Sequence, residues 1–253
     1  MHIKERGGDG PALVFLHYWG GSSRTWTEVI SALPADYHTI APDLRGWGQS
    51  GAREGDAYAL ADFAGDVEQL VADLGLKRYV LVGHSMGGKI AQLLASRRPP
   101  GLAGLVLVAP SPPTPLALPP EARAAMAAAY DTPASVGMAI DHMLTAKPLT
   151  AAQREQVVAD SLRGTPEARA AWPAHTSRED ISAEVQRIAV PTMVVAGELD
   201  KVDPVAVLAA ELLPRIPQAT LYVLPGCGHL SPLEAPQALA TVIRNFVAAL
   251  PPA

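Results

Sequence analysis

Val80-Leu81-Val82-Gly83-His84-Ser85-Met86-Gly87-Gly88 is the stretch that decides the fold. A short run of apolar, mostly β-branched residues stops at Gly83, presents one serine and continues into a helical pattern over Met86–Arg97. This pattern predicts a strand, a very tight turn and a helix, with Ser85 at the apex. Glycine two residues before and two after the serine suits a backbone that passes too close for side chains. A turn this strained would project the Ser85 hydroxyl from the end of a sheet.

The length and composition predict one substantial core with room for an inserted subdomain. The chain has 253 residues, of which 49% are hydrophobic. A single α/β domain of this length buries roughly 75% of its unfolded surface. The net charge of -5 and the pI near 5.8 argue against nucleic acid or an anionic membrane as a partner. The lone cysteine, Cys227, excludes an intrachain disulfide and favours a reducing compartment.

No part of the sequence predicts a membrane segment or a signal peptide. Residues 1–8 are polar, and the first apolar run, Ala12–Leu16, is too short for the core of a signal sequence. No stretch approaches the ~20 apolar residues that span a bilayer. We therefore expect a soluble, cytoplasmic protein without a membrane partner.

Up to residue 110, strand and helix patterns alternate along the chain. Apolar runs predict strands at 13–17, 37–41 and 104–109, in addition to the strand that leads into Ser85. Apolar residues at helical spacing predict an amphipathic helix over 60–74, with Gly75 where a C-cap glycine belongs. This alternation indicates an α/β fold with a doubly wound, mostly parallel sheet and helices on both faces.

The alternation breaks between residues 111 and 186, where no convincing strand pattern occurs. Thr132-Pro133 and Thr165-Pro166 place a capping hydroxyl before a proline at the first helical position, and Thr150–Gln153 forms a capping box. With a further helix over 121–130, about four short helices are expected. We interpret 111–186 as an all-helical cap inserted after the sixth strand of a core domain formed by 1–110 and 187–253.

Strand and helix patterns resume after the cap. Strands are expected at 191–196 and 220–224, each followed by a loop and a helix. The first loop carries Asp200 and the second carries His229. In a doubly wound sheet, loops at the carboxyl ends of the strands converge on one crevice.

These loops supply what a serine nucleophile needs. A serine hydroxyl requires a base within hydrogen-bond reach, and the base requires an orienting carboxylate. His229 is the candidate base and Asp200 the candidate acid, and Asp203 and Glu198 compete for the acid position in the same loop. His17, at another strand end, is interpreted as a structural residue of its loop.

The chain outside the cap resembles small, single-cap α/β-hydrolases, the group that includes carboxylesterases and cofactor-free haloperoxidase-like esterases. The resemblance rests on the Ser85 turn, the order Ser85, Asp200, His229, and a Gly-x-x-Asp-x-x-x-Pro motif from Gly197 to Pro204. The motif favours Asp200 as the acid.

Two backbone N–H groups are expected to bind the oxyanion. Met86 N–H, at the start of a helix, is one candidate. In the family, the second donor follows the glycine of a His-Gly pair. Here the loop reads His17-Tyr18-Trp19, with Tyr18 in place of that glycine. Trp19 is the aligned donor, and the choice between Trp19 and Tyr18 stays open.

The resulting prediction is two-step acyl transfer through an acyl-enzyme, with no cofactor and no metal. The expected substrate is a small, uncharged acyl or aryl ester. Further residues are expected to line the substrate pocket: Tyr18, Tyr130, Met138, Met143 and Trp172.

Other activities use the same residues. Hydrolysis of a C–C bond in a diketo acid would require a cation near the substrate carboxylate, for which Arg123, Lys147 and Arg178 are candidates. Perhydrolysis and hydroxynitrile cleavage stay open. A ligand receptor that retains the three residues without catalysis is a more remote alternative.

Overall fold

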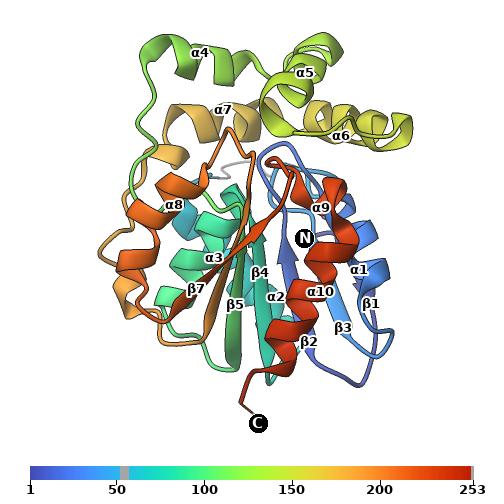
Figure 1. Ribbon diagram of the computed structural model, residues 1–253, viewed down its shortest axis with the longest axis vertical. Coiled ribbons are helices and arrows are strands. Elements are labelled where there is room, and N and C mark those ends of the chain that lie inside the picture. Colours follow the sequence, from blue (N-terminus) through green and yellow to red (C-terminus); the bar gives the residue numbers. More distant parts are fainter. Residues whose placement is uncertain (52–56, 252–253) are drawn as a thin grey trace.

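The computed structural model describes residues 1–51 and 57–251 (Figure 1). Its centre is a seven-stranded sheet in the order β1-β3-β2-β4-β5-β6-β7. Only β1 runs antiparallel to its neighbour, β3, and the other pairs are parallel. The strands are β1 (Ile3–Arg6), β2 (Ala12–Leu16), β3 (His38–Pro42), β4 (Tyr79–His84), β5 (Leu102–Val108), β6 (Thr192–Gly197) and β7 (Ala219–Leu224). The predicted α/β fold with a mostly parallel sheet is confirmed.

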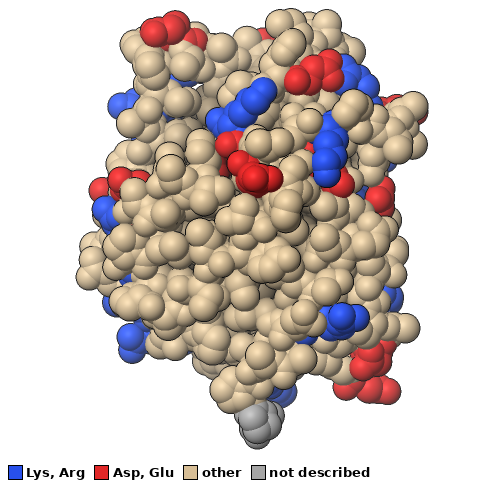
Figure 2. Space-filling view, in the orientation of Figure 1, with Lys and Arg blue, Asp and Glu red and all other residues tan. Residues whose placement is uncertain are grey.

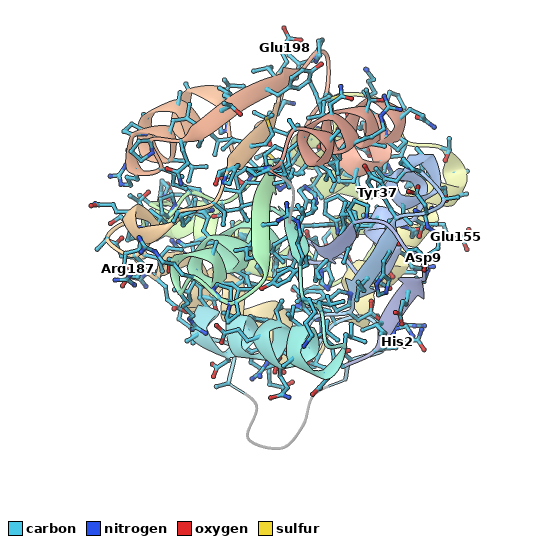
Figure 3. The ribbon with its side chains drawn as sticks, turned by 90° about the horizontal axis from the view of Figure 1, so that it is seen from below. His2, Asp9, Tyr37, Glu155, Arg187 and Glu198 are labelled. Carbon is cyan, nitrogen blue, oxygen red and sulfur yellow. The ribbon has the colours of Figure 1, made fainter. Side chains whose placement is uncertain are left out.

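Helices cover both faces of the sheet, which explains why its inner strands are continuous apolar runs. β2 and β4 are buried along their whole length. The core helices are α1 (Thr27–Ala32), α2 (Leu60–Asp73), α3 (Met86–Ser96), α8 (Val205–Glu211), α9 (Ser231–Glu234) and α10 (Pro236–Ala248). α1 packs on α10 on one face, and α2 packs on α3 on the other. Seen from below, the strands run between these two layers (Figure 3).

Four α-helices and a π-helix lie between β5 and β6. They are α4 (Pro120–Ala128), α5 (Pro133–Ala139), the π-helix Ile140–Leu144, α6 (Ala151–Arg163) and α7 (Pro166–Ala174). We call this part of the chain the helical insertion. Thr132, Thr150 and Thr165 each accept a hydrogen bond from a backbone N–H of the first turn, as their sequence patterns predicted. In Figure 1 the four α-helices form a layer above one end of the sheet.

Three details of the sequence prediction were wrong. The insertion follows the fifth strand of the described chain, not the sixth, because the residues before Ala12 form a single strand. That strand, β1, was missed because Ile3-Lys4-Glu5-Arg6 is mostly polar and pairs only at the sheet edge. The short helix α9 was also missed, since it occupies four residues directly after the His229 loop.

Candidate active site

Ser85 occupies a sharp turn between β4 and α3. Its backbone angles are φ 52° and ψ −114°, a conformation that L-residues adopt only under constraint. The turn needs glycine on both sides. A Cβ on Gly83 would lie 2.4 Å from the Gly87 carbonyl oxygen, and a Cβ on Gly87 would lie 2.6 Å from two carbonyl oxygens of the strand end opposite. The close approach predicted from the sequence is therefore present.

The backbone of Ser85 is fully engaged and its hydroxyl is not. Its N–H donates to Val108 O (3.1 Å), and its carbonyl accepts from Lys89 N (3.0 Å) and Ser111 N (3.1 Å). Within residues 1–51 and 57–251, the Ser85 Oγ makes no hydrogen bond. The sheet and α3 thus fix the residue and leave its hydroxyl available.

His229 and Asp200 form a buried pair. Their side chains meet at 2.9 Å between Nδ1 and Oδ2, and the residues are 2% and 5% exposed. The other oxygen of Asp200 accepts from Val202 N (2.8 Å) and Asp203 N (3.1 Å). Since a carboxylate only accepts, His229 Nδ1 carries a proton, and Nε2 is the nitrogen left to act as a base.

The two groups shift each other's pKa in opposite directions. Burial alone would lower the pKa of His229, but the charge of Asp200 and its hydrogen bond outweigh burial and raise it. Burial alone would raise the pKa of Asp200, but the charge of His229 and the hydrogen bonds that Asp200 accepts lower it. The pair therefore favours an ionised carboxylate beside a histidine that is more basic than usual.

The structure distinguishes the three carboxylates of the acid loop. Asp200 is the one bonded to His229. Asp203 is buried and makes no side-chain hydrogen bond to any described residue, and burial raises its pKa to about 8. Glu198 accepts from Gly226 N (2.7 Å) on the exposed side, and Figure 3 shows it at the periphery of the molecule. The geometry favours Asp200 as the partner of the candidate base.

The loop after β2 faces the serine turn. His17 Nε2 accepts from Leu44 N (3.0 Å), so its Nδ1 carries the proton that it donates to Tyr18 O (2.7 Å). Burial lowers the pKa of His17, which favours this neutral form. Both ring nitrogens are thus used to fix the loop, in agreement with the structural role expected for His17.

A tyrosine fits in this loop without strain. Among the described non-glycine residues, a positive φ occurs only at Ser85, Arg98 and Ala109, so Tyr18 needs none of glycine's freedom. The Tyr18 ring packs against His84, with 5.2 Å between ring centroids. This contact joins the loop to the end of β4.

The two N–H groups expected to bind the oxyanion are both available. Trp19 N and Met86 N donate no hydrogen bond to any atom of residues 1–51 or 57–251. Met86 N is the first N–H of α3, where the helix supplies no acceptor. Trp19 lies in the loop after β2 and is 7% exposed.

The helical insertion holds the outer side of this loop. Tyr130 stacks on Trp19 with 4.1 Å between ring centroids, and its hydroxyl donates to Trp19 O (3.0 Å). Trp19 Nε1 donates to Arg169 O (3.2 Å), and Ser161 Oγ donates to Gly20 O (3.1 Å). The candidate oxyanion loop therefore lies between the sheet and the insertion.

A buried carboxylate extends this contact. Asp160 of α6 accepts from Ser22 Oγ (2.9 Å) and binds the Arg24 guanidinium through both oxygens, with 2.6 Å to Nη2. Asp160 is 4% exposed. The sequence analysis missed Asp160 and Arg24, because 136 residues separate them and no local pattern links them.

The predicted pocket residues divide into two groups. Tyr18, Tyr130 and Trp172 are buried in the same apolar cluster as Trp19 and Met86. Met138 and Met143 are 64% and 46% exposed, and their place in the pocket stays a prediction. Their helices bury other positions: Val136, Gly137, Ile140 and Leu144.

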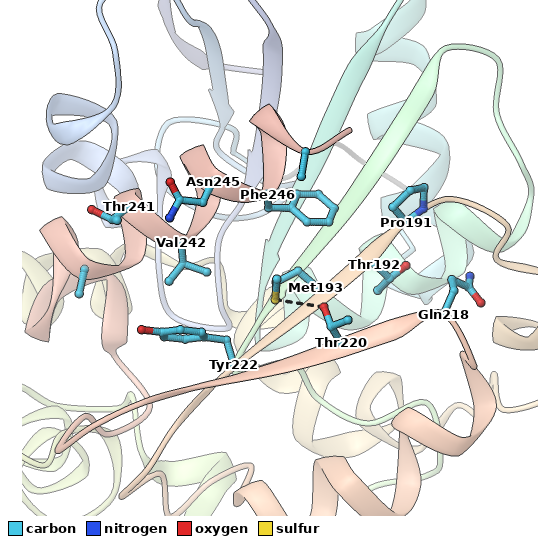
Figure 4. Close-up of a pocket in the computed structure, with 12 residues that line it drawn as sticks. Pro191, Thr192, Met193, Gln218, Thr220, Tyr222, Thr241, Val242, Asn245 and Phe246 are labelled. Atoms are coloured by element: carbon cyan, nitrogen blue, oxygen red, sulfur yellow. Dashed lines mark hydrogen bonds between the residues drawn. The ribbon is translucent and has the colours of Figure 1, made fainter. Parts of the chain in front are cut away.

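A cavity of about 580 Å³ lies away from these residues (Figure 4). It is formed by β6, β7 and α10, and Met193, Tyr222 and Phe246 are among its lining residues. Ser85, Asp200 and His229 are not part of it, and they are 8%, 5% and 2% exposed. The candidate site is identified by the position of these reactive groups and not by the volume of a cavity.

Among residues 1–51 and 57–251, no group of three or more His, Cys, Asp or Glu side chains is arranged to hold a metal ion. No helix in these ranges is long and apolar enough to cross a membrane.

Comparison with known proteins places this geometry in a family. Residues 11–236 match the family model described as alpha/beta hydrolase fold. The chain is 30% identical over 256 residues to the pimeloyl-(acyl-carrier protein) methyl ester esterase of Aeromonas salmonicida strain A449, covering 96% of this chain and 98% of that protein. It is 29% identical to a non-heme haloperoxidase of Rhodococcus erythropolis, covering 88% of this chain and 86% of that one.

Solved structures agree on the fold. The esterase EaEST from Exiguobacterium antarcticum superimposes with a TM-score of 0.89 at 21% identity, over 98% of this chain and 95% of that one. The match over residues 11–236, together with the full-length relative at 30% identity, shows that the chain belongs to the α/β hydrolase fold family.

Proposed function

We propose that this protein is a serine hydrolase that cleaves small, largely apolar carboxylic esters through a Ser85-His229-Asp200 triad. The observation that carries the proposal is a pair of features at one end of the parallel strands. Ser85 stands on a strained turn with φ 52° after β4, and a buried His229–Asp200 pair with a 2.9 Å hydrogen bond lies in the loops that follow β6 and β7. Strained, glycine-flanked serines and buried His–carboxylate pairs are the components of activated nucleophiles.

The first half of the proposed reaction forms an acyl-enzyme. His229 Nε2 takes the proton from Ser85 Oγ as the oxygen attacks the ester carbonyl carbon. The carbonyl oxygen becomes an anion and is bound by Met86 N–H and Trp19 N–H, two donors with no partner among the described residues. His229 then gives its proton to the leaving alkoxide, and the C–O bond of the ester breaks.

The second half repeats these steps with water. His229 takes a proton from the water as its oxygen attacks the acyl carbon. The same donors hold the second oxyanion, and collapse returns the proton to Ser85 Oγ and releases the acid. Asp200 keeps the proton on Nδ1 of His229 and stabilises the imidazolium in both halves.

The surroundings favour an uncharged substrate. Trp19, Tyr130, Trp172 and Met86 are all buried in the apolar cluster that extends from the core into the insertion. Burying a charged group among such side chains is costly unless a partner neutralises it. A small acyl or aryl ester has no such requirement, and one full-length relative is named as a methyl ester esterase.

The cations suggested for a diketo acid give little support to C–C hydrolysis. Arg123 is engaged with backbone carbonyls: it donates to Pro173 O and Leu116 O, each at 2.6 Å. Lys147 and Arg178 are exposed. A substrate carboxylate near Ser85 would therefore lack a ready partner among these three residues, and ester hydrolysis is the better-supported function.

We further propose that residues 111–186 act as a cap over the site. The support is its contact with the loop after β2, through Tyr130, Asp160, Ser161 and Arg169. A cap fixed to this loop would limit the space beside Ser85, which favours small substrates over triglycerides.

A panel of p-nitrophenyl esters with acyl chains of two to twelve carbons tests the function, with wild type and Ser85→Ala compared. We expect turnover by the wild type that is highest for short chains and absent in the variant. Turnover that survives Ser85→Ala would contradict the proposal. Circular dichroism of both proteins serves as the folding control.

A further inference from the structure

Glu234, at the end of α9, connects two parts of the molecule. Its Oε1 accepts from the insertion, at Ala146 N (2.7 Å) and Lys147 N (3.0 Å). Its Oε2 accepts from Gly228 N (3.0 Å), the residue before His229. One carboxylate thus satisfies three backbone donors, two on the segment after the π-helix and one on the loop of the candidate base.

The contact between these segments is tight. A Cβ on Gly228 would lie 2.6 Å from Ala146 N and 2.9 Å from the Thr145 carbonyl carbon. On the other side of His229, Leu230 N donates to Leu144 O (2.9 Å). Of the two neighbours of His229, Gly228 therefore binds the carboxylate that also binds the insertion, and Leu230 binds the insertion directly.

The contacts with the insertion add to those that the core makes with the His229 loop. Leu199 N donates to Cys227 O (2.8 Å), two residues before the histidine. From Gly228 onward the backbone contacts run to Glu234, to Leu144 and, through the His229 carbonyl, to His84 Nε2 (2.8 Å). Glu234 is central to this set.

Charge adds a second effect. Glu234 is half-buried, and burial raises its pKa even though the three N–H donors act in the opposite direction. After Asp200 and Asp203, its charge is a further influence that raises the pKa of His229. Figure 2 shows basic and acidic side chains gathered near the level where the insertion meets the core, while the lower core face in that view is mostly uncharged.

We propose that Glu234 is a positioning residue for His229, which couples the docking of the insertion at Thr145–Lys147 to the placement of the base. The proposal rests on the proposed function, since it assumes that His229 is the base. In this account, the insertion contributes to the chemical step as well as to substrate access.

Two substitutions separate geometry from charge. Glu234→Gln keeps the size of the side chain but has one acceptor oxygen, so it cannot serve both Gly228 N and the two insertion donors. Glu234→Asp keeps the charge but loses one methylene of reach. Glu198→Gln is the matched control, because Glu198 binds a single N–H of the same loop, at Gly226, which an amide oxygen can still accept.

The measurements are kcat, KM and the pH profile of kcat/KM on a short-chain p-nitrophenyl ester. Rates are expressed per site that reacts with a fluorophosphonate to completion, so unfolded protein does not enter the comparison. We expect both Glu234 variants to lower kcat about tenfold with KM within twofold, because a misplaced base slows proton transfer. We expect the acid limb to move to lower pH in Glu234→Gln only, and Glu198→Gln to match the wild type.

The outcomes distinguish this inference from the function beneath it. A wild type without Ser85-dependent turnover contradicts the proposed function itself. An active wild type with Glu234→Gln and Glu234→Asp equal to it in kcat overturns the positioning role alone. A loss confined to thermal stability, with kcat per labelled site and the acid limb unchanged, also overturns it.

Discussion

The two sides of the candidate site are built in different ways. Ser85, Asp200 and His229 lie in loops at the ends of strands, and the strands hold these loops close to the sheet. Trp19 lies opposite, and Tyr130 and Arg169 of the insertion hold its loop from outside. In the proposed function, the sheet side supplies the reactive groups and the insertion side supplies the wall of the pocket.

The helices of the insertion differ in how many residues they bury. α6 buries Val157, Asp160 and Ser161, and two of these side chains bind the loop after β2. α4 buries no residue and packs mainly against α7, as its place at the top of Figure 1 illustrates. One part of the insertion is therefore integrated into the site, and another part is attached loosely.

Asp200→Asn is expected to have the largest effect, because it acts on the sheet side. The amide can no longer hold the proton on His229 Nδ1 or stabilise the imidazolium, so kcat should fall on the order of 10⁴-fold. Asp203→Asn, three residues away, should leave kcat within about threefold, since Asp203 does not bond His229. Ester turnover by both variants checks this. The reverse order of losses would assign the acid to Asp203.

The pH profile of kcat/KM tests the reactive groups on the sheet side of the candidate site. His229 must be neutral to accept a proton, and its pKa is raised by Asp200 despite burial. Activity should therefore be full above this raised pKa and be lost as the pH falls through it. We expect an acid limb in kcat/KM above about 6.5, with a drop of about tenfold per pH unit below it. An acid limb below about pH 6.5 would mean that burial, which lowers the pKa of His229, outweighs the effect of Asp200.

Asp160→Ala tests the insertion side, and its effect should be smaller. It leaves Ser22 and Arg24 without their partner, at a cost of about 2 kcal/mol in unfolding free energy, because Arg24 keeps access to water. We expect kcat/KM to fall about tenfold to a hundredfold as the Trp19 loop loosens. Urea unfolding and ester kinetics measure the two quantities.

Asp141→Ala is the matched control for Asp160→Ala. Asp141 also pairs with an arginine of the insertion, Arg154, through both oxygens, but both side chains are exposed. Exposed ion pairs contribute little to stability. The control should unfold at the same urea concentration as the wild type and keep its kinetics. Equal losses in the two variants would contradict the distinction between docked and loose contacts.

A substitution in α4 is expected to have the smallest effect on activity. Hydrogen exchange should show faster amide exchange in α4 than in α6, because a helix without buried residues opens locally at low cost. Ala125→Gly should weaken α4 by about 1 kcal/mol and accelerate exchange there, without changing kcat/KM. Protection in α4 equal to that in α6 would show that the insertion behaves as one unit.

Local patterns predicted most of the fold. The threonines that cap α5, α6 and α7 stand where the sequence placed them, since a cap depends only on neighbouring residues. The Ser85 turn is equally local, because its glycines and serine lie within five residues. β1 was not predicted because its pairing partner, β3, is distant in the sequence and its own residues form no apolar run.

Contacts between distant segments could not be predicted from one sequence. Met138 and Met143 lie in a segment predicted to be helical, but a single sequence does not say which face of each helix is buried. Asp160 and Glu234 have no local signature at all, and their roles depend on how the insertion docks. Tyr18 was doubtful in sequence because a glycine is usual there. Its φ lies outside the positive range, so the position does not require the backbone freedom of glycine.

Covalent reaction at Ser85 is the most direct test of the account. Wild type and Ser85→Ala are treated with a fluorophosphonate, and their intact masses are measured. The account predicts one adduct per wild-type chain, formed faster above the pKa of His229 than below it, and none on the variant. An unlabelled wild type, or equal labelling of both proteins, would contradict the claim that this turn carries an activated serine.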